Sequence, residues 1–302
     1  MTRTPTSGTP TSGTPTSRAS AAGRLDDVRC ITFDFGNTLV PVDRAALRRV
    51  VELTGEWAIR HLEPVPIETF HAVWAVERER QFREDIPRFR EADLAIRFGR
   101  VIARLRGMAS PPPDLAWDDA AAAGRSDPGE IAAAVEVYSR SFIDAIPPPP
   151  DVGPLLARLA AHRRVGILSN WPFAATIDRY VESAGWAEHL TAVVVSQRVG
   201  SIKPHPSIFA AAEAALGAPD PAVCLHVGDD WAADVVGAIR AGWRAAHIHG
   251  RPEDSPLPSS DADGTVEADL ELDSLADLEA ALPAAPPVPP HVPKARAHAP
   301  QQ

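Results

Sequence analysis

The chain has 302 residues, 45% of them hydrophobic and 23% charged, which suits a globular protein of two domains or one large domain with an insertion. Its 40 acidic residues outnumber 30 lysines and arginines, and the formal charge of -10 argues against a duplex nucleic-acid partner. The two cysteines, Cys30 and Cys224, exclude a disulfide scaffold and favour a reducing compartment, so a cytoplasmic protein is expected.

Both ends of the chain are predicted to be disordered. Residues 1–24 carry a repeated Thr-Pro-Thr-Ser-Gly unit with nothing to bury, and residues 283–302 are rich in proline and alanine. No stretch approaches the roughly 18 apolar residues that cross a bilayer, and the start of the chain lacks the apolar segment of a secretory signal. Neither a membrane partner nor export is therefore expected.

The first predicted strand leads directly into a polar turn. Residues Arg29–Phe33 are rich in β-branched and aromatic side chains, as in a short buried strand. Asp34, Gly36, Asn37 and Thr38 follow it at once. Because α/β sheets bind ligands at the carboxyl ends of their strands, this turn is a candidate site.

Residues 42–150 are predicted to form an all-helical insertion, which prolines at 111–113 and 147–150 punctuate and a helix near Ile131–Ile146 closes. The prediction rests on apolar residues at near-helical spacing: Phe70, Val73, Trp74, Val76, Leu94, Ile96, Phe98, Val101, Ile102 and Leu105. We expect its tryptophans mainly in its core and its arginines on a solvated face, where one or two could bind an anionic part of a ligand. These residues are Trp57, Trp74 and Trp117, then Arg78, Arg80, Arg83, Arg88, Arg90, Arg97, Arg100 and Arg104, balanced by Glu77, Glu79, Glu84 and Glu91.

Strands and helices alternate from Pro154 onward, which predicts βαβ units and a mainly parallel sheet. Strands are expected over residues 165–168, 192–195, 223–227, 245–248 and 270–272, and helices over 155–161, 173–183, 206–216, 234–241 and 275–282. The predicted fold is therefore α/β, a Rossmann-like parallel sheet with helices on both faces, formed by residues 25–41 and 151–282, plus the all-helical domain of residues 42–150.

Four polar clusters each follow a predicted strand. They are Asp34 with Thr38, Ser169 with Asn170, Lys203 before Pro204, and Gly228-Asp229-Asp230 with Asp234. Because parallel strands end at one edge of a sheet, we expect the clusters to converge in one active site. Carboxylates, a hydroxyl and an ammonium can together hold a divalent cation and a phosphoryl group while one carboxylate attacks phosphorus.

These clusters resemble the motifs of the haloacid dehalogenase superfamily, in their order along the chain and in the helical insertion between the first and second, where that family places its cap. The resemblance covers roughly residues 29–282. It rests on Phe33-Asp34-Phe35-Gly36-Asn37-Thr38-Leu39, Ile167-Leu168-Ser169-Asn170, Ile202-Lys203-Pro204, and His226-Val227-Gly228-Asp229 followed by Asp234 and Gly237-Ala238.

The resemblance implies a role for each polar residue. Asp34 would be the nucleophile that becomes an aspartyl-phosphate, Ser169 would bind the phosphoryl oxygens and Lys203 would neutralise the charge. Thr38 and Asn170 would also contact the small phosphorylated substrate.

The resemblance also implies a Mg²⁺ site. Asp34, Asp229 and the main-chain carbonyl of Gly36 would bind the ion, and oxygen ligands are those that Mg²⁺ prefers. Asp234 would orient Lys203 or the metal-bound waters, with Asp230 as a helper.

One position departs from the family pattern. Phosphatases of this family usually carry a second Asp two residues after the nucleophile as general acid and base, and here that residue is Gly36. A positioned acid contributes typically about 10²- to 10⁴-fold, so hydrolysis of phosphate esters should be weakened. Glycine could also be required by a left-handed backbone at this position.

Three functions remain open. The first is a Mg²⁺-dependent phosphatase whose leaving group needs little protonation, such as an acyl phosphate, or which borrows an acid from the insertion or the substrate. The second is a dehalogenase-like enzyme in which Asp34 displaces halide, although Gly228-Asp229 favours a cation and hence phosphate. The third is a non-catalytic relative that binds a phosphorylated ligand or a protein.

Some of these residues also have plainer interpretations. Ser169-Asn170 before Pro172 could cap a helix. His247 and His249 alternate on a strand at metal-ligand spacing, but without a third ligand in the sequence nearby they are expected to be polar residues at a strand end. Cys30 and Cys224 are expected on adjacent strands as buried thiols.

Overall fold

The computed structural model describes residues 25–217 and 220–283, so the predictions of disorder for residues 1–24 and 284–302 lie outside the described residues. Its centre is a six-stranded parallel sheet in the order β3-β2-β1-β4-β5-β6, which confirms the predicted α/β fold. The strands are β1 (Cys30–Phe33), β2 (Arg164–Ser169), β3 (Ala192–Val195), β4 (Cys224–Gly228), β5 (Arg244–Ile248) and β6 (Leu270–Leu272).

Helices cover both faces of the sheet. On one face, Ile31 and Phe33 of β1 belong to the core cluster that includes Ile177 and Leu278. On the other face, Cys30 packs in a second cluster with Phe209. The helices of this domain are α6 (Val152–Ala160), α7 (Ala174–Ser183), α8 (Ser196–Val199), α9 (Pro206–Leu216), α10 (Gly237–Arg240) and α11 (Leu275–Ala281).

The helix predicted over residues 234–241 begins earlier than expected. A π-helical turn, Trp231–Val236, starts it and α10 continues it. The Asp230 carboxylate accepts a hydrogen bond from Ala233 N at 3.1 Å, which satisfies a free amide at the start of the turn.

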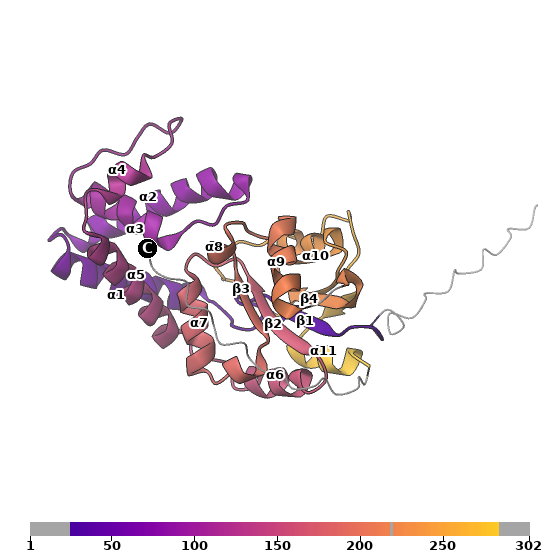
Figure 1. Ribbon diagram of the computed structural model, residues 1–302. Coiled ribbons are helices and arrows are strands. Elements are labelled where there is room, and N and C mark those ends of the chain that lie inside the picture. The colour runs from indigo at the N-terminus through magenta and orange to yellow at the C-terminus, as the bar shows by residue number, and fades with distance from the viewer. Residues whose placement is uncertain (1–24, 218–219, 284–302) are drawn as a thin grey trace, which may run out of the picture.

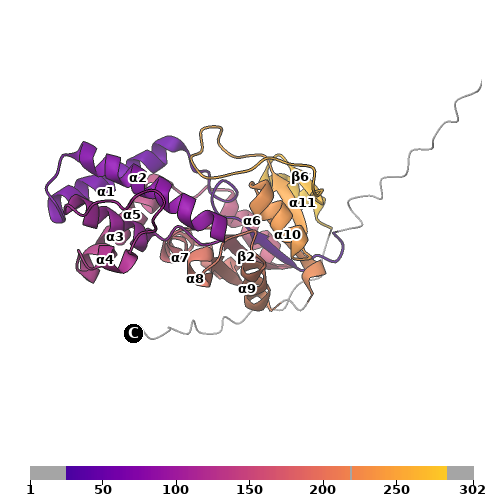
Figure 2. The ribbon, with the colours of Figure 1, turned by 90° about the horizontal axis from the view of Figure 1, so that it is seen from above.

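The insertion folds as a helical body beside the sheet (Figures 1 and 2). Its helices are α1 (Arg44–His61), α2 (Ile67–Asp85), α3 (Leu94–Leu105), α4 (Asp119–Ala123) and α5 (Pro128–Ala145), with α1 packed on α5 and α2 on α3. Local sequence fixes several starts: Asp43 caps α1, Asp93 caps α3, and Asp127 with Glu130 forms a capping box on α5. Within the described ranges, every helix is too short or too polar to span a bilayer.

The prediction that the charged residues of the insertion lie on a solvated face is wrong for several of them. Four of them are buried: Glu77, Arg80, Arg97 and Arg100. Glu77 forms an ion pair with Arg104, and Arg80 and Arg100 both form ion pairs with Glu84. Arg97 lines a cavity. Conversely, two apolar residues of the helical pattern are exposed, Val76 by 49% and Ile96 by 38%. Trp74 and Trp117 are buried as expected, and Trp57 is half-buried.

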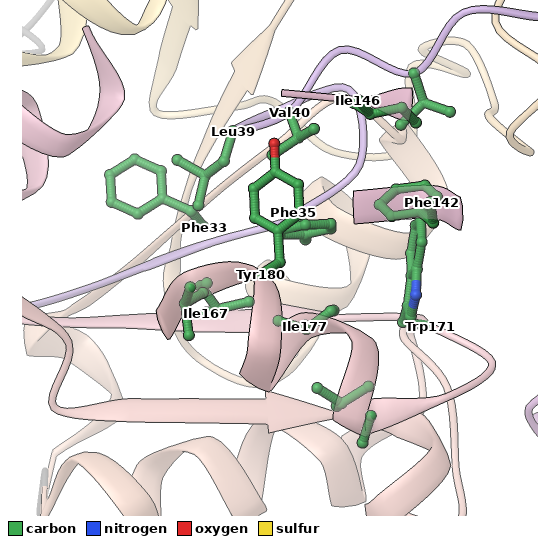
Figure 3. Packing of buried hydrophobic residues seen from close by; sticks show 14 of the residues in the cluster. Phe33, Phe35, Leu39, Val40, Phe142, Ile146, Ile167, Trp171, Ile177 and Tyr180 are labelled. Atoms are coloured by element: carbon green, nitrogen blue, oxygen red, sulfur yellow. The ribbon is translucent and has the colours of Figure 1, made fainter. Parts of the chain in front are cut away.

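An aromatic cluster joins the insertion to the sheet domain (Figure 3). Phe35, which follows Asp34, packs edge-on against Trp171 at 5.4 Å and Tyr180 at 5.0 Å between ring centroids. Phe142 of α5 contacts Trp171 at 4.9 Å. Edge-to-face pairs add to the stabilisation from burial. The cluster thereby fixes the turns after β1 and β2, where the polar motifs lie.

Candidate active site

The polar clusters predicted from the sequence meet at one edge of the sheet. Phe33 pairs in register with Ile167 of β2 and Val227 of β4, so Asp34 emerges between the ends of those strands. Asp34, Lys203, Asp229 and Asp234 line one cavity of about 350 Å³ together with residues of the helical insertion.

Lys203 is the electrostatic centre of this site. Its Nζ donates hydrogen bonds to Asp34 Oδ1 at 2.7 Å, Asp234 Oδ1 at 2.6 Å and the Leu168 carbonyl at 2.8 Å. Burial alone would lower the pKa of the ammonium, but the carboxylates of Asp234 and Asp34 outweigh it and raise that pKa above its ordinary value. Lys203 is therefore a fixed positive charge against Asp34.

Asn170 holds the loop that carries Lys203. Its Oδ1 accepts from Lys203 N at 2.7 Å and its Nδ2 donates to Lys203 O at 3.1 Å. Helix α7 begins at Ala174, and Phe173 caps it without a side-chain bond, so Asn170 is not a helix cap. Asn170 also lines the cavity, where the sequence predicted a substrate contact.

His226 completes this network and was missed by the sequence analysis. Its Nε2 lies 3.0 Å from Asp234 Oδ1 and its Nδ1 lies 2.8 Å from Thr32 Oγ1. Burial and the nearby Lys203 lower its pKa, while Asp234 and Thr32 offset part of that decrease, so the imidazole is neutral. The available signal was a lone histidine inside the apolar strand two residues before Gly228.

Asp34 and Asp229 are the two carboxyl groups of the site whose pKa values are raised most. Burial raises the pKa of Asp34 to about 6 even though Lys203 opposes the rise. Burial, with the charges of Asp34 and Asp234, raises the pKa of Asp229 to about 8. Lys203 lies beside the half-buried Asp34 and Arg251 lies 3.4 Å from the buried Asp229. Even so, two carboxylates this close disfavour double ionisation unless a further cation lies between them.

The donor set fits a hard divalent cation. One oxygen each of Asp34, Asp229 and Asp234 lies within 4.8 Å of the others. Both oxygens of Asp234 are already bound, to Lys203 and His226 through Oδ1 and to Asp230 N through Oδ2 at 2.9 Å. Asp34 and Asp229 are therefore the candidate ligands, and oxygen ligation matches Mg²⁺.

Thr38 and Ser169 differ in their surroundings. The Thr38 hydroxyl lies 3.5 Å from Asp229 Oδ1, so it orients a candidate metal ligand. The Ser169 hydroxyl offsets part of the rise in the Asp34 pKa, yet it is buried and has no partner of hydrogen-bond geometry among the described residues. A buried unsatisfied hydroxyl beside Asp34 is suited to an oxygen of a bound ligand.

Comparison with known proteins agrees with this geometry. Residues 28–242 match the family of haloacid dehalogenase-like hydrolases. The chain belongs to this family. It is 30% identical over 131 residues, 42% of this chain and 56% of the other, to pyrimidine 5'-nucleotidase YjjG of Escherichia coli (strain K12). It is 26% identical to glyceraldehyde 3-phosphate phosphatase of Methanopyrus kandleri, over 82% of this chain and 93% of that enzyme.

Solved structures share the fold of this hydrolase. A 2-haloacid dehalogenase from Pseudomonas syringae superposes with a TM-score of 0.57 at 22% identity, over 84% of this chain and 97% of that one. The HAD-hydrolase YfnB from Bacillus subtilis, bound to magnesium, superposes with a TM-score of 0.55 at 17% identity, over 84% and 98%.

Packing leaves little room for a side chain at position 36 of this hydrolase. Its backbone is not left-handed, which corrects that expectation; the left-handed residue is Asn37, with φ of 60°. A Cβ at position 36 would lie 2.6 Å from Leu257 Cδ1. The side chain of Leu257 therefore fills the space in which an aspartate at position 36 would begin.

Leu257 belongs to a loop, residues 249–260, that the sequence analysis did not connect with the site. The loop runs from the sheet domain toward α2 (Figure 2). Arg251 Nη1 lies 3.4 Å from Asp229 Oδ2, Ser255 Oγ lies 3.0 Å from Asn37 Oδ1, and Ser260 Oγ donates to Asp230 Oδ1 at 2.6 Å. Asp230 thus anchors this loop as well as the π-helical turn. A loop of polar residues and prolines without periodicity gives no sequence signal for such contacts.

Two other predicted pairs lie apart from these contacts. Cys30 and Cys224 are buried neighbours in register on β1 and β4, as expected. The structure adds Glu271 of β6 to His247 and His249, at 3.1 Å and 2.8 Å from their ring nitrogens. Glu271 is thus the third possible ligand that the sequence did not show beside the two histidines, and one ligand atom from each of the three side chains lies within 4.8 Å of the others.

Proposed function

We propose that this hydrolase is a Mg²⁺-dependent phosphatase that acts on a small phosphorylated metabolite through an aspartyl-phosphate on Asp34. The observation that carries the proposal is the pair of neighbouring carboxylates, the half-buried Asp34 and the buried Asp229, with pKa values raised to about 6 and about 8. A reaction at carbon needs one carboxylate, whereas a second one beside it serves to hold a cation against an anionic phosphoryl group.

The residues of the site have complementary tasks in this reaction. Lys203 binds Asp34 Oδ1 and keeps the carboxylate ionised, so its other oxygen can attack phosphorus. The bond between phosphorus and the substrate's leaving-group oxygen breaks, and the leaving group departs with its electron pair and takes up a proton from water. The unsatisfied hydroxyl of Ser169 is a donor for a phosphoryl oxygen. Water then attacks the aspartyl-phosphate, the Asp34 oxygen–phosphorus bond breaks, and inorganic phosphate leaves.

Asp34, Asp229 and the main-chain carbonyl of Gly36 are the proposed ligands of Mg²⁺, which when bound supplies positive charge against the phosphoryl oxygens. Thr38 and Arg251 contact Asp229 and limit its orientation. Asp234 acts on Lys203, because its own oxygens are bound to Lys203, His226 and the main chain.

The leaving group determines which phosphates are cleaved fast. Outside the three carboxylates near Lys203, the carboxyl groups of the described cavity lining are those of Asp230 and Glu91. Tyr138 also lines the cavity, but burial raises the pKa of its hydroxyl and makes it a weaker acid. Asp230 is bound to Ser260 and Ala233, and Glu91 is bound to Ser196 and Ala92 N. We therefore propose acyl or aryl phosphates, whose leaving groups need little protonation, as the best substrates.

Phosphate release from acetyl phosphate and p-nitrophenyl phosphate, with Mg²⁺ or with excess chelator, tests this function. We expect release with Mg²⁺ and its loss on chelation, without halide release from 2-chloropropionate. Halide release that persists in chelator would replace the proposal by a dehalogenase. Binding of phosphorylated ligands without any release would identify a non-catalytic relative.

A further inference from the structure

The side of the cavity formed by the helical insertion carries two arginines. Arg97 of α3 and Arg78 of α2 line the same cavity as Asp34 and Lys203. Arg97 is only 3% exposed. The sheet domain contributes the reactive groups. The two arginines therefore face the part of a ligand that extends away from those reactive groups.

The Arg97 guanidinium is held in place by neutral groups. Its Nε donates to Gln81 Oε1 at 3.0 Å and its Nη2 to the Ala92 carbonyl at 3.3 Å. Trp74 and Phe82 flank it, with ring centroids 5.3 Å and 5.8 Å from its central carbon. Nη1 has no hydrogen-bond partner in the part of the chain that the structure describes. The group is thus fixed, with donors left for a ligand.

Other buried arginines of the insertion are neutralised within the protein. Arg80 binds Glu84 at 2.8 Å, and Arg100 binds both Glu84 at 2.8 Å and Asp119 at 2.6 Å. Arg97 has no carboxylate within 4.0 Å among residues 25–217 and 220–283. A buried charge without a counter-ion is costly. The lack of an ion pair at Arg97, in contrast to Arg80 and Arg100, therefore points to an anionic ligand as its counter-ion.

Arg78 adds a second uncompensated charge on the same side. It is half-buried, forms no ion pair with the described residues, and its Nη2 lies 3.5 Å from the Pro256 carbonyl. Burial lowers the pKa of Arg97 to about 10, and the charge of Arg78 adds to this decrease while Glu91 and Asp93 offset part of it, so Arg97 stays charged at neutral pH. Two cations beside one small cavity attract an anion strongly.

We propose that Arg97, assisted by Arg78, binds a second anionic group of the substrate, a carboxylate or a second phosphate, on the insertion side of the cavity. The inference rests on the proposed phosphatase function and narrows its substrate class to small phosphates with a second negative charge. Guanidinium groups bind such oxyanions through paired N–H donors. Phe82 and Ile86, which also line the cavity, suit a short carbon chain between the two anions.

Matched substrates test this subsite: 3-phosphoglycerate and propane-1,3-diol bisphosphate carry a second anion, while glycerol 3-phosphate ends in a neutral hydroxymethyl group. For wild type we expect kcat/KM for at least one substrate with the second anionic group to exceed kcat/KM for glycerol 3-phosphate by a ratio of about 10 to 100, as loss of a charge-assisted hydrogen bond predicts. In Arg97→Met this ratio should fall toward one, and Arg78→Met should reduce it less. The exposed Arg88→Met is the control that keeps the ratio.

A wild-type ratio near one, or an unchanged ratio in a folded Arg97→Met, would overturn the proposal. Should Arg97→Met fail to fold, Arg97→Lys keeps the charge and loses the paired donors, and must still lower the ratio. Calorimetric binding to Asp34→Asn separates the two claims. If no substrate turns over but the ligands with a second anionic group still bind at least about 10-fold more tightly than glycerol 3-phosphate, only the phosphatase function fails; equal binding contradicts the subsite.

Discussion

Asp229 illustrates how one side chain couples the chemistry of the site to the stability of the protein. Its carboxyl is buried near Asp34 and Asp234, and these surroundings raise its pKa to about 8 from the ordinary value of 3.8. A carboxyl of this kind favours folding when protonated, because the unfolded chain ionises it at much lower pH. A bound cation reverses this, because the folded protein then favours the ionised carboxylate.

This coupling predicts a metal-dependent pH profile of stability. In chelator, the contribution of Asp34 and Asp229 to the free energy of unfolding should be highest below about pH 4. This contribution should fall as pH rises through about 6 and about 8. Thermal melts at about pH 5.5 and about pH 8.5 should therefore show a lower melting temperature at the higher pH without Mg²⁺. Added Mg²⁺ should raise the melting temperature, and more so at the higher pH.

Asp229→Asn is the control for this profile, since the amide does not titrate. Its melting temperature in chelator should change less with pH than that of wild type, and Mg²⁺ should raise it less. A wild-type melting temperature that is equally sensitive to pH with and without Mg²⁺ would contradict the assignment of Asp34 and Asp229 as the cation site.

At the scale of elements, the loop of residues 249–260 determines what position 36 can hold. A side chain there meets Leu257 Cδ1 at 2.6 Å, so Gly36→Asp alone must displace that side chain. With Leu257→Ala also present, the restored carboxyl has room to protonate the leaving group. We expect the double variant to raise hydrolysis of alkyl phosphates by up to about 10²-fold over wild type, and the single variant to gain less.

A leaving-group series on wild type, Leu257→Ala and the double variant measures this effect. In wild type, kcat should fall steeply from acetyl and aryl phosphates to alkyl phosphates, and the slope should flatten only in the double variant. Similar chemical-step rates for alkyl and acyl phosphates in wild type would show that another group already supplies the proton.

A second element-scale feature is the polar centre of the helical insertion. Glu77 of α2 is fully buried and accepts from Arg104 Nη1 at 2.7 Å and Trp117 Nε1 at 2.8 Å, which joins α2 to α3 and to the segment before α4. Glu77→Ala removes the counter-ion of a partly buried arginine. It should lower the free energy of unfolding by about 3–5 kcal/mol, measured by urea denaturation.

Glu79→Ala is the matched control on the same helix. The Glu79 side chain is 73% exposed and lies 4.0 Å from Arg83, so this change should alter the free energy of unfolding by less than about 0.5 kcal/mol. Equal effects of the two substitutions would refute a structural role for the buried network.

At the scale of the molecule, the sheet domain supplies the reactive groups and the insertion supplies the wall of the cavity that faces them. The two bodies are joined by main-chain bonds such as Leu94 N to Pro172 O at 3.0 Å and Ile202 N to Phe89 O at 3.1 Å. Gln197 Nε2 also donates to Asp93 Oδ2 at 2.9 Å. The proposed binding of a second anion by Arg97 and the proposed chemistry at Asp34 thus depend on how these bodies meet.

The sequence predicted the parallel sheet and the residues at its edge because strand ends follow from local patterns. An apolar run followed by Asp34 or Gly228-Asp229 places a carboxylate at a known position relative to neighbouring strands. Arg97, His226 and Leu257 could not be predicted in the same way. Their roles come from contacts between segments far apart in the chain, and neither helical nor strand periodicity encodes such contacts.

The most direct test of the account is whether Asp34 becomes phosphorylated. Wild type and Asp34→Asn are each mixed with acetyl phosphate and Mg²⁺, quenched in acid within one turnover, digested, and analysed by mass spectrometry. We predict one phosphoryl group on the wild-type peptide that contains Asp34, none on the corresponding peptide of the variant, and a loss of steady-state phosphate release of more than about 10³-fold in the variant. Phosphate release by Asp34→Asn at a tenth or more of the wild-type rate would contradict the account.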